Sequence, residues 1–210
     1  MTDFSLQAHS LQKSFGRRLV FCGITFNLNK PGVLGISGPN GSGKSTLIKI
    51  LAGINSPTKG QVIHSDNGKE IISEKIHNYI GFVSPYLVLY NEFSAWENLN
   101  YFALIRNISF DKSKVESLLD QFLLLNRKDD LVKAYSSGMK QRLKFIFALM
   151  HSPAFIFLDE PTSNLDDEGK QTVYNLIKSE SEKAIVVVAS NERNDLANCN
   201  EVLDLNYYKR

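Results

Sequence analysis

One short segment constrains the fold of this chain more than any other. Residues 38–45 read Gly-Pro-Asn-Gly-Ser-Gly-Lys-Ser, the pattern of a phosphate-binding loop. Its glycines let backbone N–H groups converge on phosphate oxygens, and a following helix points its positive end at the same anion. An apolar run at Val33–Ser37 precedes the loop and a helical pattern at Ser45–Ala52 follows it. This strand–loop–helix context favours a phosphate site over a plain glycine-rich turn.

The loop pattern also assigns roles to single side chains. Lys44 is placed to pair with the β and γ phosphates of a nucleoside triphosphate, and the Ser45 hydroxyl can ligate Mg²⁺. The nucleotide-contacting residues predicted here are Gly38, Pro39, Asn40, Gly41, Ser42, Gly43, Lys44, Ser45 and Thr46.

A second chemical signal lies about a hundred residues further on. The run Phe155–Leu158 is continuously apolar, as in a strand buried on both faces, and Asp159 and Glu160 follow it directly. A carboxylate at a strand end can hold Mg²⁺, and a second can orient and activate an attacking water. We therefore assign Asp159 to the metal and Glu160 to the general base. Alone, this acidic strand end would equally fit an ordinary turn.

The distribution of patterns along the chain predicts one α/β domain with a helical insert. Strand patterns fill the first third and return after residue 152, whereas the middle carries helical spacing with a capping-box sequence at Ser94–Glu97. Residues 1–83 and 152–210 are expected to form a nucleotide-binding core with an antiparallel β portion near the N-terminus, and residues 84–151 a helical subdomain.

These motifs, in this order, resemble those of the ATP-binding-cassette (ABC) ATPases over essentially the whole chain. Tyr135–Met139 is similar to the family's signature sequence, and Ser163–Asp166 to its D-loop. Phe15 stands where the family has an aromatic residue that stacks on adenine. The resemblance implies a phosphate-loop NTPase core of ABC type that binds and hydrolyses ATP with Mg²⁺.

The resemblance also implies a dimer. In the family, the signature sequence binds the γ-phosphate of the ATP held by the opposite subunit, which gives that role to Ser136 and Gly138. Without the resemblance, Ser136 reads as the cap of a helix. The implied partners are a second copy of the chain or a homologous ATPase subunit, and separate integral-membrane permease subunits received in a groove at about Pro85–Trp96.

Two positions depart from the family's pattern. Pro85 stands where the family has a glutamine that links the core to the helical lobe, and Asn191 where it has a histidine that contacts the γ-phosphate. Ser84 and Tyr86 are the candidates to replace the glutamine. Asn191 is counted here among the catalytic residues, with Glu160 and Lys44; the alternative is that it only turns the chain.

Composition and charge limit the possible partners and location of the protein. A net charge of +2 without any block of like charge gives no support for nucleic acid as a partner. No apolar stretch approaches the roughly 20 residues that span a bilayer, and no signal-peptide pattern opens the chain. Together with the permease that the resemblance implies, this predicts a cytoplasmic protein held at the inner face of the membrane. The alternatives are a soluble ABC ATPase acting on ribosomes or DNA, and a low-turnover regulatory clamp. The compact length is similar to the haem-exporter subgroup.

Overall fold

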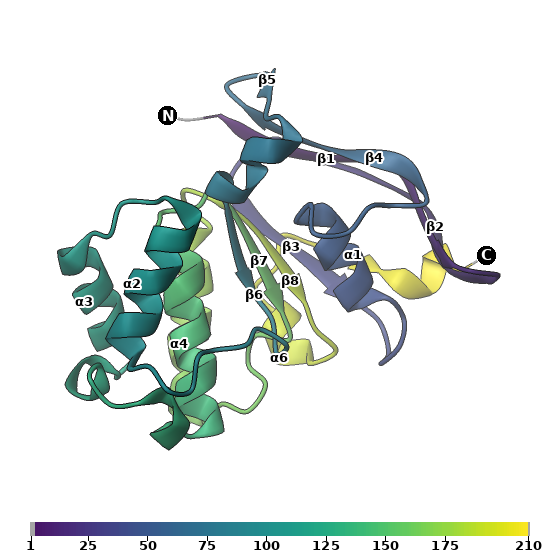
Figure 1. Ribbon diagram of the computed structural model, residues 1–210. Helices are drawn as coiled ribbons and strands as arrows, with labels where there is room; N and C mark the ends of the chain where they lie inside the picture. The colour runs from purple at the N-terminus through teal and green to yellow at the C-terminus, as the bar shows by residue number, and fades with distance from the viewer. Residues whose placement is uncertain (1–2, 210) are drawn as a thin grey trace.

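A computed structural model describes residues 3–209, and its centre is a parallel sheet (Figure 1). The five strands are ordered β6-β7-β8-β3-β9, and every neighbouring pair runs parallel. Their bounds are β3 Gly32–Ser37, β6 Ile80–Val83, β7 Phe155–Asp159, β8 Ile185–Ala189 and β9 Glu201–Asp204. Strands β7 and β8 are buried at every residue, which explains why they read as unbroken apolar runs.

The two faces of this sheet belong to different cores because side chains alternate along a strand. Ile185 and Val187 pack with Leu47 of helix α1, whereas Val186 and Val188 pack with Val173 of helix α5. Helix α1 spans Lys44–Leu51, α5 spans Asp167–Glu180 and the short α6 spans Arg193–Leu196. The direction in which a residue leaves a strand end is therefore fixed by its place in this alternation.

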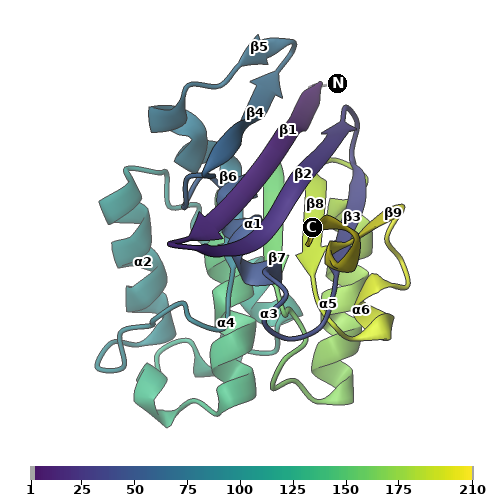
Figure 2. The same cartoon turned by 90° about the vertical axis from the view of Figure 1, so that its right-hand side faces the viewer.

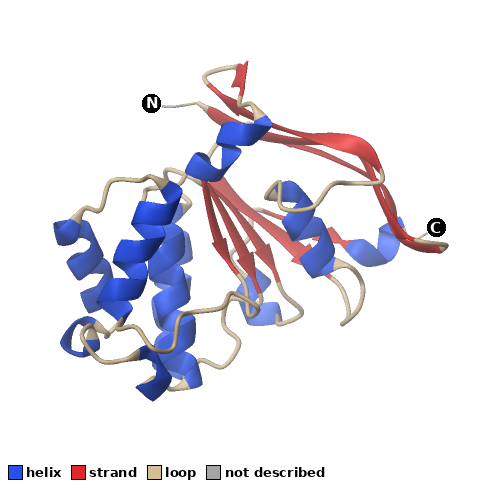
Figure 3. Cartoon of the chain, in the orientation of Figure 1, coloured by secondary structure: helices blue, strands red, loops and turns tan. Residues whose placement is uncertain are grey.

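An antiparallel sheet covers α1 on the side away from the parallel sheet (Figures 1 and 3). Its order is β2-β1-β4-β5, with bounds β1 Phe4–Phe15, β2 Arg18–Leu28, β4 Lys59–Asp66 and β5 Lys69–Glu70. His64 of β4 is buried here beside Phe155, and its Nε2 lies 2.8 Å from the carbonyl oxygen of Leu51. Burial lowers the pKa of His64 to about 4, so it is a neutral core residue.

Three helices gather beside the edge strand β6 (Figure 2). They are α2 Ala95–Arg106, α3 Lys112–Gln121 and α4 Ser137–Leu149. Each starts with a side-chain cap: Ser94 and Glu97 form a complete capping box, and Asp111 and Ser136 cap α3 and α4 with their side chains. Helix α4 packs on β6 and joins this lobe to the sheet. Short 3₁₀ turns, η1 Ser73–Tyr79, η2 Leu125–Arg127, η3 Val132–Ala134 and η4 Leu205–Tyr208, complete the connections.

Candidate active site

The segments that follow β3, β7 and β8 meet beside the start of α1, at the carboxyl ends of the parallel strands (Figure 1). A cavity of about 790 Å³ opens there. It brings together Phe15 and residues 40–46 of the loop with Glu160 and Asn191, the two predicted catalytic residues outside the loop, whereas Gly38 and Pro39 do not line it. Its walls are Phe15, Arg18, Val20, Asn40, Gly41, Ser42, Gly43, Lys44, Ser45, Thr46, Pro85, Tyr86, Glu160, Ser163, Asn164 and Asn191.

The loop itself has the conformation that its glycines allow. Gly41 and Gly43 have φ angles of 74° and 108°, a region that other residues rarely adopt. A Cβ on Gly43 would also lie 2.5 Å from a methyl carbon of Val20. Pro39 contributes its carbonyl oxygen, which accepts a 3.0 Å hydrogen bond from the Ser42 amide. The glycines are therefore required by the curl of the loop.

Lys44 points its ammonium group back across this loop. The side chain is 6% exposed; Nζ donates a 2.9 Å hydrogen bond to the Gly38 carbonyl oxygen and lies 3.4 Å from Oε1 of Glu160. A cation held over a glycine-rich loop at the start of a helix is the arrangement that receives phosphate oxygens.

Asp159 and Ser45 meet because of strand alternation. Asp159 lies on the same side of β7 as Phe155 and Phe157, the side that packs on α1, and there Ser45 Oγ donates a 2.9 Å hydrogen bond to its Oδ1. Asp159 is fully buried, and its Oδ2 has no hydrogen-bond partner among residues 3–209. Burial raises the pKa of this carboxyl, against the lowering effect of the Ser45 hydrogen bond. A buried carboxylate oxygen without a partner, beside a hydroxyl, suits a divalent cation.

Glu160 is turned into the cavity by its backbone. Its φ of 48° lies in the left-handed region, which is uncommon for a residue other than glycine and concentrates at functional sites. Its amide donates a 2.8 Å hydrogen bond to the Ala189 carbonyl oxygen, which fixes the turn. The carboxylate then lies between Lys44, 3.4 Å from Oε1, and Ser190, whose Oγ lies 3.3 Å from Oε2.

Asn191 lies against the loop. Its Nδ2 donates a 3.2 Å hydrogen bond to Oδ1 of Asn40, so its amide is directed at the residues predicted to hold phosphate. The side chain is not confined to a turn of its own segment, which supports the interpretation that it belongs to the site.

The segment around Pro85 is anchored from the lobe. Lys144 of α4, 8% exposed, donates through Nζ to the carbonyl oxygens of Ser84 and Pro85, at 3.2 and 2.7 Å. Of the two candidates to replace the family's glutamine, Tyr86 lines the cavity, whereas Ser84 is buried and does not line it. The position of Tyr86 at the cavity therefore favours it over Ser84 as the replacement for the glutamine.

Phe15 and the signature residues differ in their relation to this cavity. Phe15 is 56% exposed at its rim, with the Lys13 ammonium 5.0 Å from the ring centroid. Ser136 and Gly138 do not line it: Ser136 is exposed and caps α4 by accepting from the Met139 amide, and Gly138 lies against the Asn164 backbone. Ser136 is therefore exposed and Gly138 half-buried, and both lie outside the chain's own cavity.

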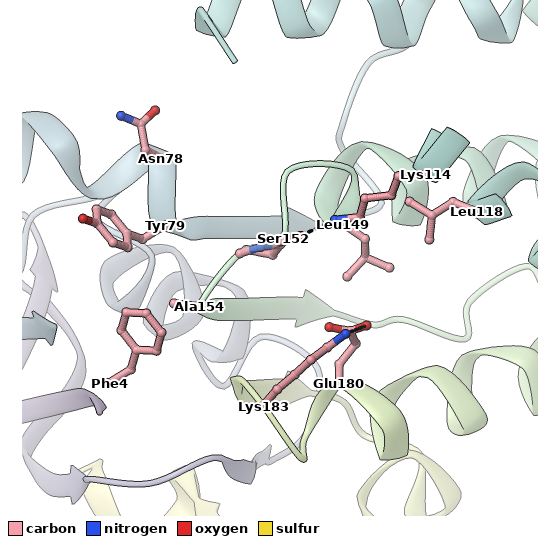
Figure 4. Close-up of a pocket in the computed structure, with 11 residues that line it drawn as sticks. Phe4, Asn78, Tyr79, Lys114, Leu118, Leu149, Ser152, Ala154, Glu180 and Lys183 are labelled. Atoms are coloured by element: carbon pink, nitrogen blue, oxygen red, sulfur yellow. Dashed lines mark hydrogen bonds and ion pairs between the residues drawn. The ribbon is translucent and has the colours of Figure 1, made fainter. Parts of the chain in front are cut away.

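A second cavity, of about 390 Å³, lies near the opposite end of the parallel strands (Figure 4). Lys183 pairs with Glu180 at 3.1 Å, and Lys114 donates to Ser152. These lysines are thus occupied by their neighbours, and the cavity shares none of its lining with the loop at 38–45.

Comparison with known proteins decides between the families that use such a loop. A family model described as "ABC transporter" matches residues 21–163. The chain belongs to the ABC transporter family. Its members couple ATP to transport, so this chain is an ATP-binding, ATP-hydrolysing subunit that powers a transporter.

Individual relatives agree with the ABC assignment. The chain is 35% identical over 185 residues to "Lantibiotic transport ATP-binding protein SrtF" of Streptococcus pyogenes, covering 88% of this chain and 79% of the relative. It is 32% identical to "Linearmycin resistance ATP-binding protein LnrL" of Bacillus subtilis (strain 168), covering 87% of this chain and 60% of the relative. A putative ABC transporter ATP-binding protein from Pyrococcus furiosus has the same fold, with a TM-score of 0.84 at 24% identity, covering 98% of this chain and all of that one. Resemblance to the haem-exporter subgroup stays a prediction.

Proposed function

We propose that two copies of this chain close on two molecules of ATP with Mg²⁺, each ATP held by the loop of one copy and capped by Ser136 and Gly138 of the other. The observation that carries this proposal is the position of the signature residues: they are accessible at the surface but excluded from the chain's own cavity. Backbone N–H groups in the first turn of a helix have no partner within that helix, so the start of α4 at Ser137 is suited to an anion that a second molecule presents. Each site is then completed by its partner.

Within the closed site, different side chains have different roles in ATP binding and hydrolysis. Lys44 and the loop amides hold the phosphates, and Ser45 with Asp159 would hold Mg²⁺, which supplies positive charge against the charge that develops on the phosphate oxygens. Glu160 orients the attacking water and takes its proton. Phe15 at the rim stacks on the adenine, and Asn191 donates a hydrogen bond to the γ-phosphate.

We further propose that the permease docks beside Pro85–Trp96. Three apolar residues in that segment are conspicuously exposed: Tyr86, Val88 and Tyr90, at 75%, 85% and 59%. Within residues 3–209, no helix combines the length and apolar character needed to cross a bilayer. Separate membrane subunits would hold the protein at the inner membrane face. The transport names of the relatives favour this function over action on ribosomes or DNA.

Ser136→Arg tests the shared site. The variant is expected to bind ATP like the wild type, because Ser136 is outside the cavity of its own chain, and to lose hydrolysis, because the bulky cation cannot fit against a partner's nucleotide. Affinity is measured with a fluorescent ATP analogue and hydrolysis at rising protein concentration. The wild-type rate per chain should rise with concentration, as a dimeric site requires.

Asp111→Ala is the matched control. It also removes a side-chain helix cap in the same lobe, worth about 1 kcal/mol, but at α3, away from the cavity. It should keep the wild-type hydrolysis. Equal loss of ATP affinity and rate in Ser136→Arg would mean that the serine serves its own subunit, against the proposal.

Asn191→His is expected to raise ATP turnover several-fold, and Asn191→Ala to lower it. A histidine reaches further and can carry a charge near neutral pH, and a charge-assisted hydrogen bond is roughly twice as strong as a neutral one. Turnover and melting temperature are measured together. If both variants fold fully and hydrolyse ATP at the wild-type rate, Asn191 only shapes the turn after β8.

A further inference from the structure

A buried carboxylate outside the cavity connects to Glu160 through a single hydroxyl. Asp195 of α6 is 4% exposed, and three hydroxyl groups surround it. Ser190 Oγ donates to its Oδ2 at 2.7 Å, Tyr174 donates to Oδ1 at 3.0 Å, and Thr162 donates to Oδ1 at 2.8 Å. A buried charge with this many donors is fully compensated, and such networks hold their members in one geometry.

Sheet alternation explains why these groups meet. Ala189 ends β8 on the side of α1, so Ser190, the next residue, leaves on the opposite side, where α5 and α6 lie. The Ser190 side chain is completely buried, and its Oγ also accepts a 3.0 Å hydrogen bond from the Glu192 amide. The position of this hydroxyl is therefore fixed from two sides.

Within residues 3–209, the same hydroxyl is one of two side-chain groups in polar contact with the Glu160 carboxylate. The other is the ammonium group of Lys44. When ATP binds, its phosphate oxygens would compete with Glu160 for this ammonium group. Ser190 then becomes the main contact that determines where the carboxylate of the base lies. Ser190 has a single hydroxyl hydrogen, and Asp195 at 2.7 Å is a closer acceptor for it than Glu160 at 3.3 Å.

We propose that Asp195 is a positioning residue for hydrolysis, which acts through Ser190 on the carboxylate of Glu160. Asp195 draws the hydroxyl hydrogen to itself, so the Ser190 oxygen stays in a fixed place and the Glu160 oxygen beside it stays free to accept from water. This inference rests on the proposed role of Glu160 as the base. Burial, aided by the charge of Asp195, raises the pKa of Tyr174 to about 12, which keeps that hydroxyl a donor.

Asp195→Asn is the main test. The amide has nearly the same shape, and hydroxyl neighbours can rotate to accept from it, so the variant should fold. Without the charge, the Ser190 hydrogen can turn to Glu160 and occupy the oxygen that water needs. We expect the single-turnover rate of ATP hydrolysis to fall about tenfold while ATP affinity stays within about twofold, a separation that general destabilisation would not produce.

Three further variants test whether Asp195 acts through the Ser190 hydroxyl or only through packing of the protein interior. Ser190→Ala should also slow hydrolysis about tenfold, Ser190→Thr should keep a rate near the wild type, and the Asp195→Asn/Ser190→Ala double variant should be no slower than Ser190→Ala. Tyr174→Phe is the matched control: it removes one hydroxyl from the same carboxylate, but from the side away from Glu160, and should change the rate less than twofold.

The outcomes distinguish two failures. Asp195→Asn at the wild-type rate, or a double variant about a hundredfold slow, would overturn the positioning role while Glu160→Gln remained inactive. If Glu160→Gln instead hydrolyses ATP as fast as the wild type, the proposed role of Glu160 is overturned, and this inference with it.

Discussion

Glu160→Gln is expected to bind ATP normally and to lose hydrolysis by about 10²–10⁴, the usual contribution of a positioned base. The amide preserves the shape of the side chain between Lys44 and Ser190 but has almost no affinity for a proton. Single-turnover hydrolysis of γ-labelled ATP measures the loss, and equilibrium titration with an ATP analogue measures binding.

Glu182→Gln provides the control for this substitution, because Glu182 is an exposed acid after α5 that does not line the cavity. It should behave like the wild type. Hydrolysis by Glu160→Gln at more than about a tenth of the wild-type rate would assign the base elsewhere.

Lys44→Ala should impair binding as well as hydrolysis. The ammonium contacts phosphate in the ground state and in the transition state, so its removal acts on both. A hydrogen bond to a charged group contributes about 1.5–3 kcal/mol, which corresponds to roughly 10- to 100-fold in ATP affinity. The hydrolysis rate at saturating ATP should fall too. Lys44 also pairs with Glu160, so the variant removes a second contact in the site.

The matched control is Lys178→Ala, which removes an exposed lysine of α5 outside the cavity. Its affinity should equal that of the wild type. An unchanged affinity and rate in Lys44→Ala would contradict the assignment of residues 38–45 as the phosphate site.

Local patterns predicted those features that depend on neighbouring residues. The loop, the continuous strands β7 and β8 and the capped starts of α2, α3 and α4 each have a signal within a few residues. The bounds of a strand depend on its pairing as well as on its local pattern: β4 spans Lys59–Asp66, and both of its ends pair with β1.

Features that depend on distant residues had no such signal. Strand β6 contains Gly81, which reads as a strand breaker; a Cβ there would lie 2.3 Å from the Ala148 carbonyl oxygen, so the glycine allows α4 to approach. The left-handed backbone conformation of Glu160 could not be predicted from the sequence either, because glutamate rarely adopts it. The network of Asp195 with Thr162 and Tyr174 joins segments far apart in the chain and depends on α6, for which no pattern was found.

The central claim is that each ATP site is completed by a second copy, and the mass of Glu160→Gln with ATP and Mg²⁺ tests it most directly. Blocked hydrolysis should hold the closed form, so light scattering coupled to size-exclusion chromatography should give twice the 23.7 kDa of one chain, with one ATP bound per chain. The same variant without ATP should elute at 23.7 kDa. A mass that stays at 23.7 kDa while ATP is bound would contradict the account.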